Sequence, residues 1–112
     1  MKKSPLIFIE HILENIEKIE QFSKGISKKD LLEDSEKQYA IIRAIEVIGE
    51  AIKNLPLSLT KKYSDIPWKE IVGTRDKLIH NYFGVDLDEI WKIIKEDIPD
   101  LKKNIKEIIK KE

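Results

Sequence analysis

The chain has 112 residues, of which 41% are hydrophobic and 38% charged, and its 21 Lys and Arg residues balance 21 Asp and Glu residues. This length suits one modest core, so we expect residues 1–112 to form a single domain. The even charge excludes a generally basic surface, and any nucleic-acid binding must depend on a local patch. The absence of cysteine excludes disulfides and is typical of a cytoplasmic protein. No apolar run has membrane-spanning length, so we expect no membrane partner.

The N-terminal segment has the pattern of an amphipathic helix. Ser4 can cap this helix, and Pro5 suits its first turn. Apolar residues then recur at helical spacing as far as about Phe22. Gly25 predicts a left-handed break, and the following KKDLLED predicts a short helical turn or a bend.

A second amphipathic helix is predicted around residues 41–55, where apolar residues again recur at helical spacing. Its opposite, polar face carries Arg43, Glu46 and Glu50. Pro56 predicts the end of this helix, because a proline disfavours helical conformation at the residue before it. The stretch PLSLTKKYSDIP then predicts a connecting loop.

A third helix is predicted to begin near Ser64 or Asp65, either of which can cap it, with Pro67 in its first turn. It extends to about Tyr82, and Gly84 closes it. The sequence of this helix contains the polar residues that carry the functional prediction.

Asp86 or Asp88 can cap a fourth helix. Its apolar spacing continues across Pro99, which predicts a kink or a short break and not a reversal of the chain. No segment has the alternation of a strand. The predicted fold class is therefore all-α: an antiparallel bundle of four main helices, the fourth kinked at the proline.

Polar residues interrupt the apolar face of the third helix. Arg75 and Tyr82 are seven residues apart and point the same way, within the apolar sector. A lone charge in a hydrocarbon core is costly, so this face must border something else. His80 shares a face with Asp76, four residues before it, so the carboxylate can orient the imidazole.

These residues alone leave two explanations open. In the structural one, Arg75 pairs with Glu46 or Glu50, while His80 satisfies the last carbonyls of its helix. In the catalytic one, His80 takes the proton of a ribose 2′-OH, and the bidentate arginine stabilises the charged transition state of RNA cleavage. That reaction requires no metal or other cofactor. One histidine in the motif suits a cleft to which two chains contribute.

Other classes of site find little support in the sequence. Carboxylate metal sites in four-helix bundles use Glu-x-x-His, and neither His11 nor His80 has a glutamate three residues before it. Two histidines without cysteine disfavour a zinc site. The chain contains neither a glycine-rich phosphate loop nor a nucleophile elbow. We therefore expect no metal and no cofactor.

The stretch RDKLIHNY matches the R-x4-H-x-Y motif of the HepT-like branch of the HEPN superfamily. The segments AIIRAIEVIGEAIKNLP, DIPWKEIVGTRDKLIHNYFGVDLDEIW and IKEDIPDLKKNI also resemble successive signature segments of that branch, from about Leu6 to Ile109. The resemblance implies an all-α bundle that forms a two-fold homodimer. It also implies that the Arg/His motifs of both protomers line one shared cleft.

In function, the resemblance implies a metal-independent endoribonuclease that acts as the toxin of a two-gene toxin–antitoxin pair. The cognate antitoxin would be a minimal nucleotidyltransferase that transfers AMP from ATP to the motif tyrosine. By position, Arg75 and His80 would be catalytic with Asp76, the polar residue after the arginine, and Tyr82 would be the modification site. Two alternatives remain: a catalytically silent HEPN module that binds a nucleotide or a nucleotidyltransferase, and a helical dimer with structural ion pairs.

Overall fold

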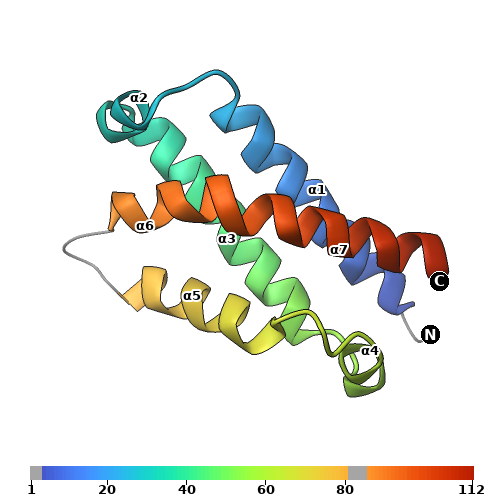
Figure 1. Cartoon of the computed structure of the whole chain (residues 1–112). Coiled ribbons are helices and arrows are strands. Elements are labelled where there is room, and N and C mark those ends of the chain that lie inside the picture. Colours follow the sequence, from blue (N-terminus) through green and yellow to red (C-terminus); the bar gives the residue numbers. More distant parts are fainter. Residues whose placement is uncertain (1–3, 81–85) are drawn as a thin grey trace.

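Helices form the regular structure of the described chain, as the sequence predicts (Figure 1). The computed structural model describes residues 4–80 and 86–112, and the side chains of residues 78–80 lie outside that description. Within these ranges the chain contains no strand, which confirms the all-α prediction. No helix in the described ranges is both long enough and apolar enough to cross a bilayer.

In the described part of the chain, four long helical segments make the bundle, and two short helices lie between the first three of them. The elements in chain order are α1 (Pro5–Ser23), α2 (Lys28–Glu33), α3 (Ser35–Lys53), α4 (Leu57–Lys62), α5 (Trp68–His80), α6 (Leu87–Lys92), the π-helix η1 (Ile93–Asp97) and α7 (Ile98–Lys111). The last three run into one another without a break, so α6, η1 and α7 form the fourth long segment.

The N-terminal helices begin and end where the capping residues predict. The Ser4 hydroxyl accepts a hydrogen bond from the Leu6 N–H at 3.3 Å, and Pro5 occupies the first turn of α1. Gly25 has φ +73°, the left-handed conformation expected at the break. A reciprocal capping box starts α2: Asp30 N–H donates to the Ser27 hydroxyl, and Ser27 N–H donates to the Asp30 carboxylate.

Helix α3 is the central element of the bundle, since it packs against α1, α2 and α5. Figure 1 shows it running through the molecule with α5 alongside it. Its buried face confirms the predicted apolar stripe and comprises Ile41, Ala44, Ile45, Ile48, Gly49, Ala51 and Ile52. The core that holds this face therefore also fixes the position of the polar residues on the rest of α3.

Two predictions for the segment between α3 and α5 are wrong. The predicted loop contains the helix α4, which Pro56 precedes in extended conformation and which buries Leu59 against the core. The third long helix begins at Trp68 and is not capped by Ser64 or Asp65. Trp68 is buried, and its indole N–H donates to the Tyr63 carbonyl at 3.1 Å. This hydrogen bond holds residues 63–67 in a turn, so α5 begins only at Trp68.

The fourth segment continues across its proline, as predicted. Asp86 caps α6 by accepting a hydrogen bond from Glu89 N–H at 3.2 Å. Before Pro99 the helix widens into the π-helix η1, and α7 follows directly. A proline lacks an N–H and its ring clashes with the carbonyl four residues before it, so a wider turn at this point relieves the conflict.

The core gives a direct test of the bundle. Ile16 of α1 is fully buried, whereas Ile7 of the same helix is 36% exposed. We expect Ile16→Ala to lower the free energy of unfolding by about 2–5 kcal/mol, through lost burial and the cavity left behind. Ile7→Ala should lower it by less than about 1 kcal/mol. Urea denaturation followed by circular dichroism measures both values, and equal losses would contradict this packing.

Candidate functional site

Arg75 crosses from α5 to α3 and is the main polar link between the two helices. Its side chain is only 14% exposed. The stem lies directly over Gly49 of α3: a Cβ atom added to Gly49 would come within 2.7 Å of Arg75 Cγ and 2.9 Å of Cδ. The stem therefore occupies the space that any side chain at position 49 would take.

Two carboxylates hold the guanidinium at the end of this stem. Arg75 Nη2 donates to Glu50 Oε1 of α3, and Nη1 donates to Asp76 Oδ1 at 2.6 Å. Of the two partners that the sequence offered for Arg75, Glu50 is the one found. Glu46 instead pairs with Arg43 at 3.1 Å on the surface of α3.

A second cation joins this cluster from α3. Lys53 Nζ lies 3.4 Å from the same Asp76 oxygen that Arg75 contacts. The hydrogen bond from Arg75, with help from the charge of Lys53, holds the pKa of the Asp76 carboxyl below its ordinary value. Asp76 is therefore ionised at neutral pH, so it accepts hydrogen bonds there and cannot donate a proton.

The guanidinium keeps donors beyond those used by the two carboxylates. It carries five N–H groups, and the buried Nε has no hydrogen-bond partner among the described residues. Glu50 and Asp76 balance the charges of Arg75 and Lys53, so the cluster is nearly neutral overall. Any anion bound here must gain from the geometry of the arginine fork more than from a wide positive field.

The described structure places the four predicted site residues to different extents. Arg75 and Asp76 lie together on α5, and His80, five residues after the arginine, is the last described residue of that helix. The side chain of His80 and the whole of Tyr82 lie outside the described residues. The predicted extension of this helix to Tyr82 and its closure at Gly84 lie outside them too.

Two residues of this cluster escaped the sequence analysis, Gly49 and Lys53. A glycine inside a helix is unfavourable, so its presence in α3 was a signal of a close approach by another group. Lys53 gave no such signal, because it is one lysine among many at the surface.

An open groove runs beside this cluster and could admit an extended ligand. It has a volume of about 840 Å³ and lies between α3, α4 and the first turns of α5, with Asp76 at its edge. Lys53, Lys61 and Lys69 line it together with Asp65, Glu70 and Asp76. The charges of this lining balance, so the groove offers cations at fixed places and not a uniformly basic surface.

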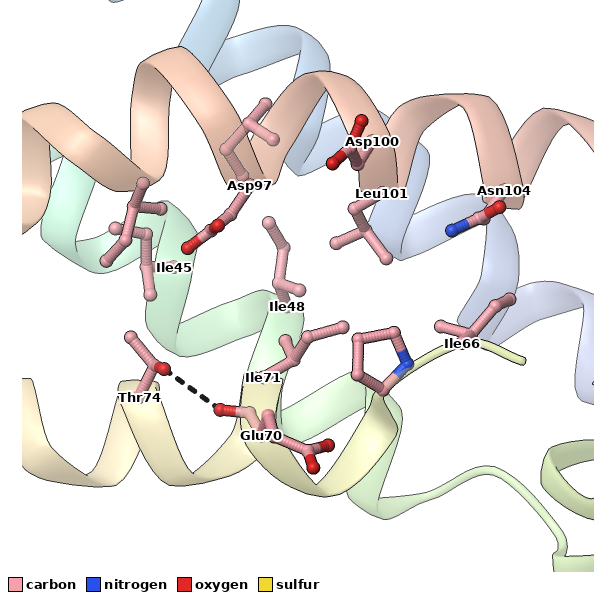
Figure 2. A pocket seen from close by; sticks show the side chains of 13 residues that line it. Ile45, Ile48, Ile66, Glu70, Ile71, Thr74, Asp97, Asp100, Leu101 and Asn104 are labelled. Atoms are coloured by element: carbon pink, nitrogen blue, oxygen red, sulfur yellow. Dashed lines mark hydrogen bonds between the residues drawn. The ribbon is translucent and has the colours of Figure 1, made fainter. Parts of the chain in front are cut away.

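A second, apolar cavity of about 180 Å³ lies on another side of α5, between that helix, α3 and α7 (Figure 2). Thr74 borders it and donates its hydroxyl to the Glu70 carbonyl at 2.9 Å. Asp97 of η1 also borders it, and burial raises the pKa of this carboxyl above its ordinary value. Its lining holds no described cation, so it is a poor place for an anionic substrate.

The described residues also bear on metal binding. Within residues 4–80 and 86–112 no group of three or more His, Asp or Glu side chains is arranged to hold a metal ion.

Comparison with known proteins places the chain in a family. Residues 12–108 match the family described as "Ribonuclease HepT-like". The chain is 49% identical over 110 residues to "Putative RNase TTE0752" of Caldanaerobacter subterraneus subsp. tengcongensis, covering 98% of both proteins. It is 51% identical over 102 residues to "Probable ribonuclease HepT" of Thermococcus cleftensis, covering 91% of this chain and 93% of that one.

A third relative is longer. "Gamma-glutamylcyclotransferase and putative RNase MJ0434" of Methanocaldococcus jannaschii is 50% identical over 109 residues, which are 97% of this chain but 49% of the relative. No solved structure matches the chain significantly. The family match spans most of the chain, and the two relatives of similar length are matched over more than nine tenths of their own length. The chain belongs to the HepT-like ribonuclease family of the HEPN superfamily.

Proposed function

We propose that the chain is a metal-independent endoribonuclease that cleaves RNA by attack of a ribose 2′-OH on the adjacent phosphate. The observation that carries this proposal is the fixed position of Arg75, seated over Gly49 and held by Glu50 and Asp76. His80, five residues after Arg75, is the last described residue of the same helix. Membership of a ribonuclease family supports the choice of RNA as substrate.

Arg75 supplies the electrostatic part of the reaction. Charge accumulates on the phosphate oxygens as the 2′-oxygen attacks, and a guanidinium can donate two parallel hydrogen bonds to them. Because the stem is buried and the head is held by two carboxylates, little reorganisation is needed when the charge develops. Glu50 and Asp76 repel the phosphate, so they fix the fork at a cost in substrate affinity.

His80 supplies the proton transfer. Asp76 is ionised at neutral pH, which removes it as a proton donor and leaves it to orient its neighbours. A histidine titrates near neutrality and can take the proton of the 2′-OH. Cleavage also needs an acid for the leaving 5′-oxygen. A two-fold dimer with both motifs in one cleft would provide a second imidazole for that step.

The proposed biological role is that of a toxin in the cytoplasm, paired with a nucleotidyltransferase antitoxin that transfers AMP to Tyr82. AMP on this tyrosine would place a phosphate and a bulky nucleoside near the motif. The phosphate could occupy the guanidinium's bidentate site, and the nucleoside would exclude the RNA backbone. Modification would then silence the enzyme without unfolding it.

Removal of either motif residue should abolish cleavage. We expect His80→Ala and Arg75→Ala each to lower the rate of RNA cleavage by about a hundredfold or more, as is usual when an acid–base group or a transition-state donor is lost. The matched controls are His11→Ala on α1 and Arg43→Ala, whose side chain is 72% exposed. Thermal melting separates lost chemistry from lost folding, because Arg75 also holds an ion pair between helices.

Metal dependence is tested in the same assay. Wild-type cleavage should be unchanged in EDTA. Inhibition by EDTA that Mg²⁺ reverses would show that the metal-free mechanism is wrong.

The composite cleft predicts a dimer. Light scattering at micromolar concentration should give about twice the 13.1 kDa mass of the chain. A monomer that still cleaves RNA would contradict the contribution of two chains to one site.

Tyr82→Phe should prevent modification while the ring is kept. After co-expression with a cognate nucleotidyltransferase, intact-mass spectrometry should show AMP-sized additions to the wild type and none to Tyr82→Phe. The variant should then still cleave RNA in the presence of the partner. Equal additions to both proteins would place the modification on another residue.

A further inference from the structure

Gly49 lies in the interior of α3, where glycine is an unfavourable residue. Its backbone does not explain it: among the described glycines only Gly25 has a positive φ. Gly49 is buried where α3 packs against α5. The reason for a glycine here must therefore be the space that a side chain would fill.

The atoms nearest to that space all belong to the stem of Arg75. The three nearest atoms to an added Cβ are Arg75 Cγ at 2.7 Å, Cδ at 2.9 Å and Cβ at 3.2 Å. Contacts below 3.0 Å require something to move, and these atoms belong to the middle of a stem whose far end is fixed by Glu50 and Asp76. By contrast, an added Cβ at Gly73 of α5 would meet nothing within 4 Å.

We propose that Gly49 is a positioning residue for Arg75. Gly49 admits the stem, and the adjacent Glu50 holds its head, so two consecutive residues of α3 determine where the guanidinium lies. The catalytic consequence rests on the proposed function. The close packing of the Arg75 stem on Gly49, called the Gly49 seat below, is a property of the fold. An alanine at position 49 pushes the stem off α3, and the fork leaves the position in which it can meet a phosphate.

An added Cβ lies 2.7 Å from Arg75 Cγ, whereas ordinary contact is 3.4–4 Å, so the stem must move by about 1 Å. Displacement of a catalytic group by about 1 Å can lower turnover by about a hundredfold. Gly49→Ala should therefore lower kcat for RNA cleavage by about that factor, with KM changed by less than about threefold, because the fork acts mainly on the charge that develops in the transition state.

The first experiment tests the seat without reference to catalysis. Melting temperatures are measured for the wild type, Gly49→Ala, Arg75→Ala and the double variant, which together form a double-mutant cycle. In the Arg75→Ala protein, Gly49→Ala should raise the melting temperature. Alanine has a higher helix propensity than glycine, and the arginine stem that its Cβ would contact is absent. With Arg75 present, its effect should be less favourable by roughly 4 °C or more.

Gly73→Ala serves as the stability control in both backgrounds, since its added carbon meets open space. Its effect on the melting temperature should not depend on Arg75. An equal effect of Gly49→Ala with and without Arg75 would overturn the seat.

The second experiment measures kcat and KM on RNA for Gly49→Ala, with Glu46→Ala as the control. Glu46 also carries an ion pair on α3, but that pair does not involve Arg75. Glu50→Ala should lower kcat as Gly49→Ala does, and Glu50→Gln, which keeps an acceptor oxygen, should restore part of the loss. Wild-type kcat in Gly49→Ala would overturn the positioning role. If the wild type itself does not cleave RNA, the proposed function fails, while the melting cycle still reports on the seat.

Discussion

The crossing of Arg75 over Gly49 determines how the polar cluster between α3 and α5 is built. An arginine side chain can be buried between two helices only where the opposing helix leaves space for the aliphatic stem and where carboxylates pair with the guanidinium charge. Gly49 meets the first condition, and Glu50 with Asp76 meets the second. A costly group is thereby fixed in one place, which suits a donor that must be ready before charge develops on a substrate.

The isoleucine core supports this arrangement from the other side of α3. The buried face of that helix packs against α1, and α1 packs in turn against α7, so α3 has little freedom to rotate. Its exposed border then carries Glu50 and Lys53 toward α5 at fixed positions. The near-neutral charge of the cluster matches the even charge of the whole chain, so an anion would be held here by directed hydrogen bonds more than by a wide positive field.

Helical periodicity and capping residues were sufficient to predict most of the bundle from sequence. Ser4, Gly25 and Asp86 marked boundaries correctly, because capping is a local interaction. The short helix α4 and the late start of α5 were missed, because burial of Leu59 and Trp68 in the core decides them. Local propensity does not contain that information.

The site could be predicted only in part, because it too depends both on local sequence pattern and on packing between helices. The position of Arg75 on an apolar face implied a buried charge and a partner, and Glu50 was one of two candidates. Choosing between Glu46 and Glu50 required the rotation of α5 against α3, which no local pattern gives. The role of Gly49 depends on that same packing.

The chemistry of the cut ends tests the proposed reaction most directly. A synthetic RNA is cleaved in EDTA, and its products are identified by mass spectrometry beside a substrate with 2′-deoxyribose at the cut position. Attack by the 2′-OH predicts a 2′,3′-cyclic phosphate or its hydrolysis product on one fragment, a 5′-OH on the other, and no cleavage of the deoxy substrate. A 5′-phosphate, or cleavage of the deoxy substrate at the same rate, would contradict it.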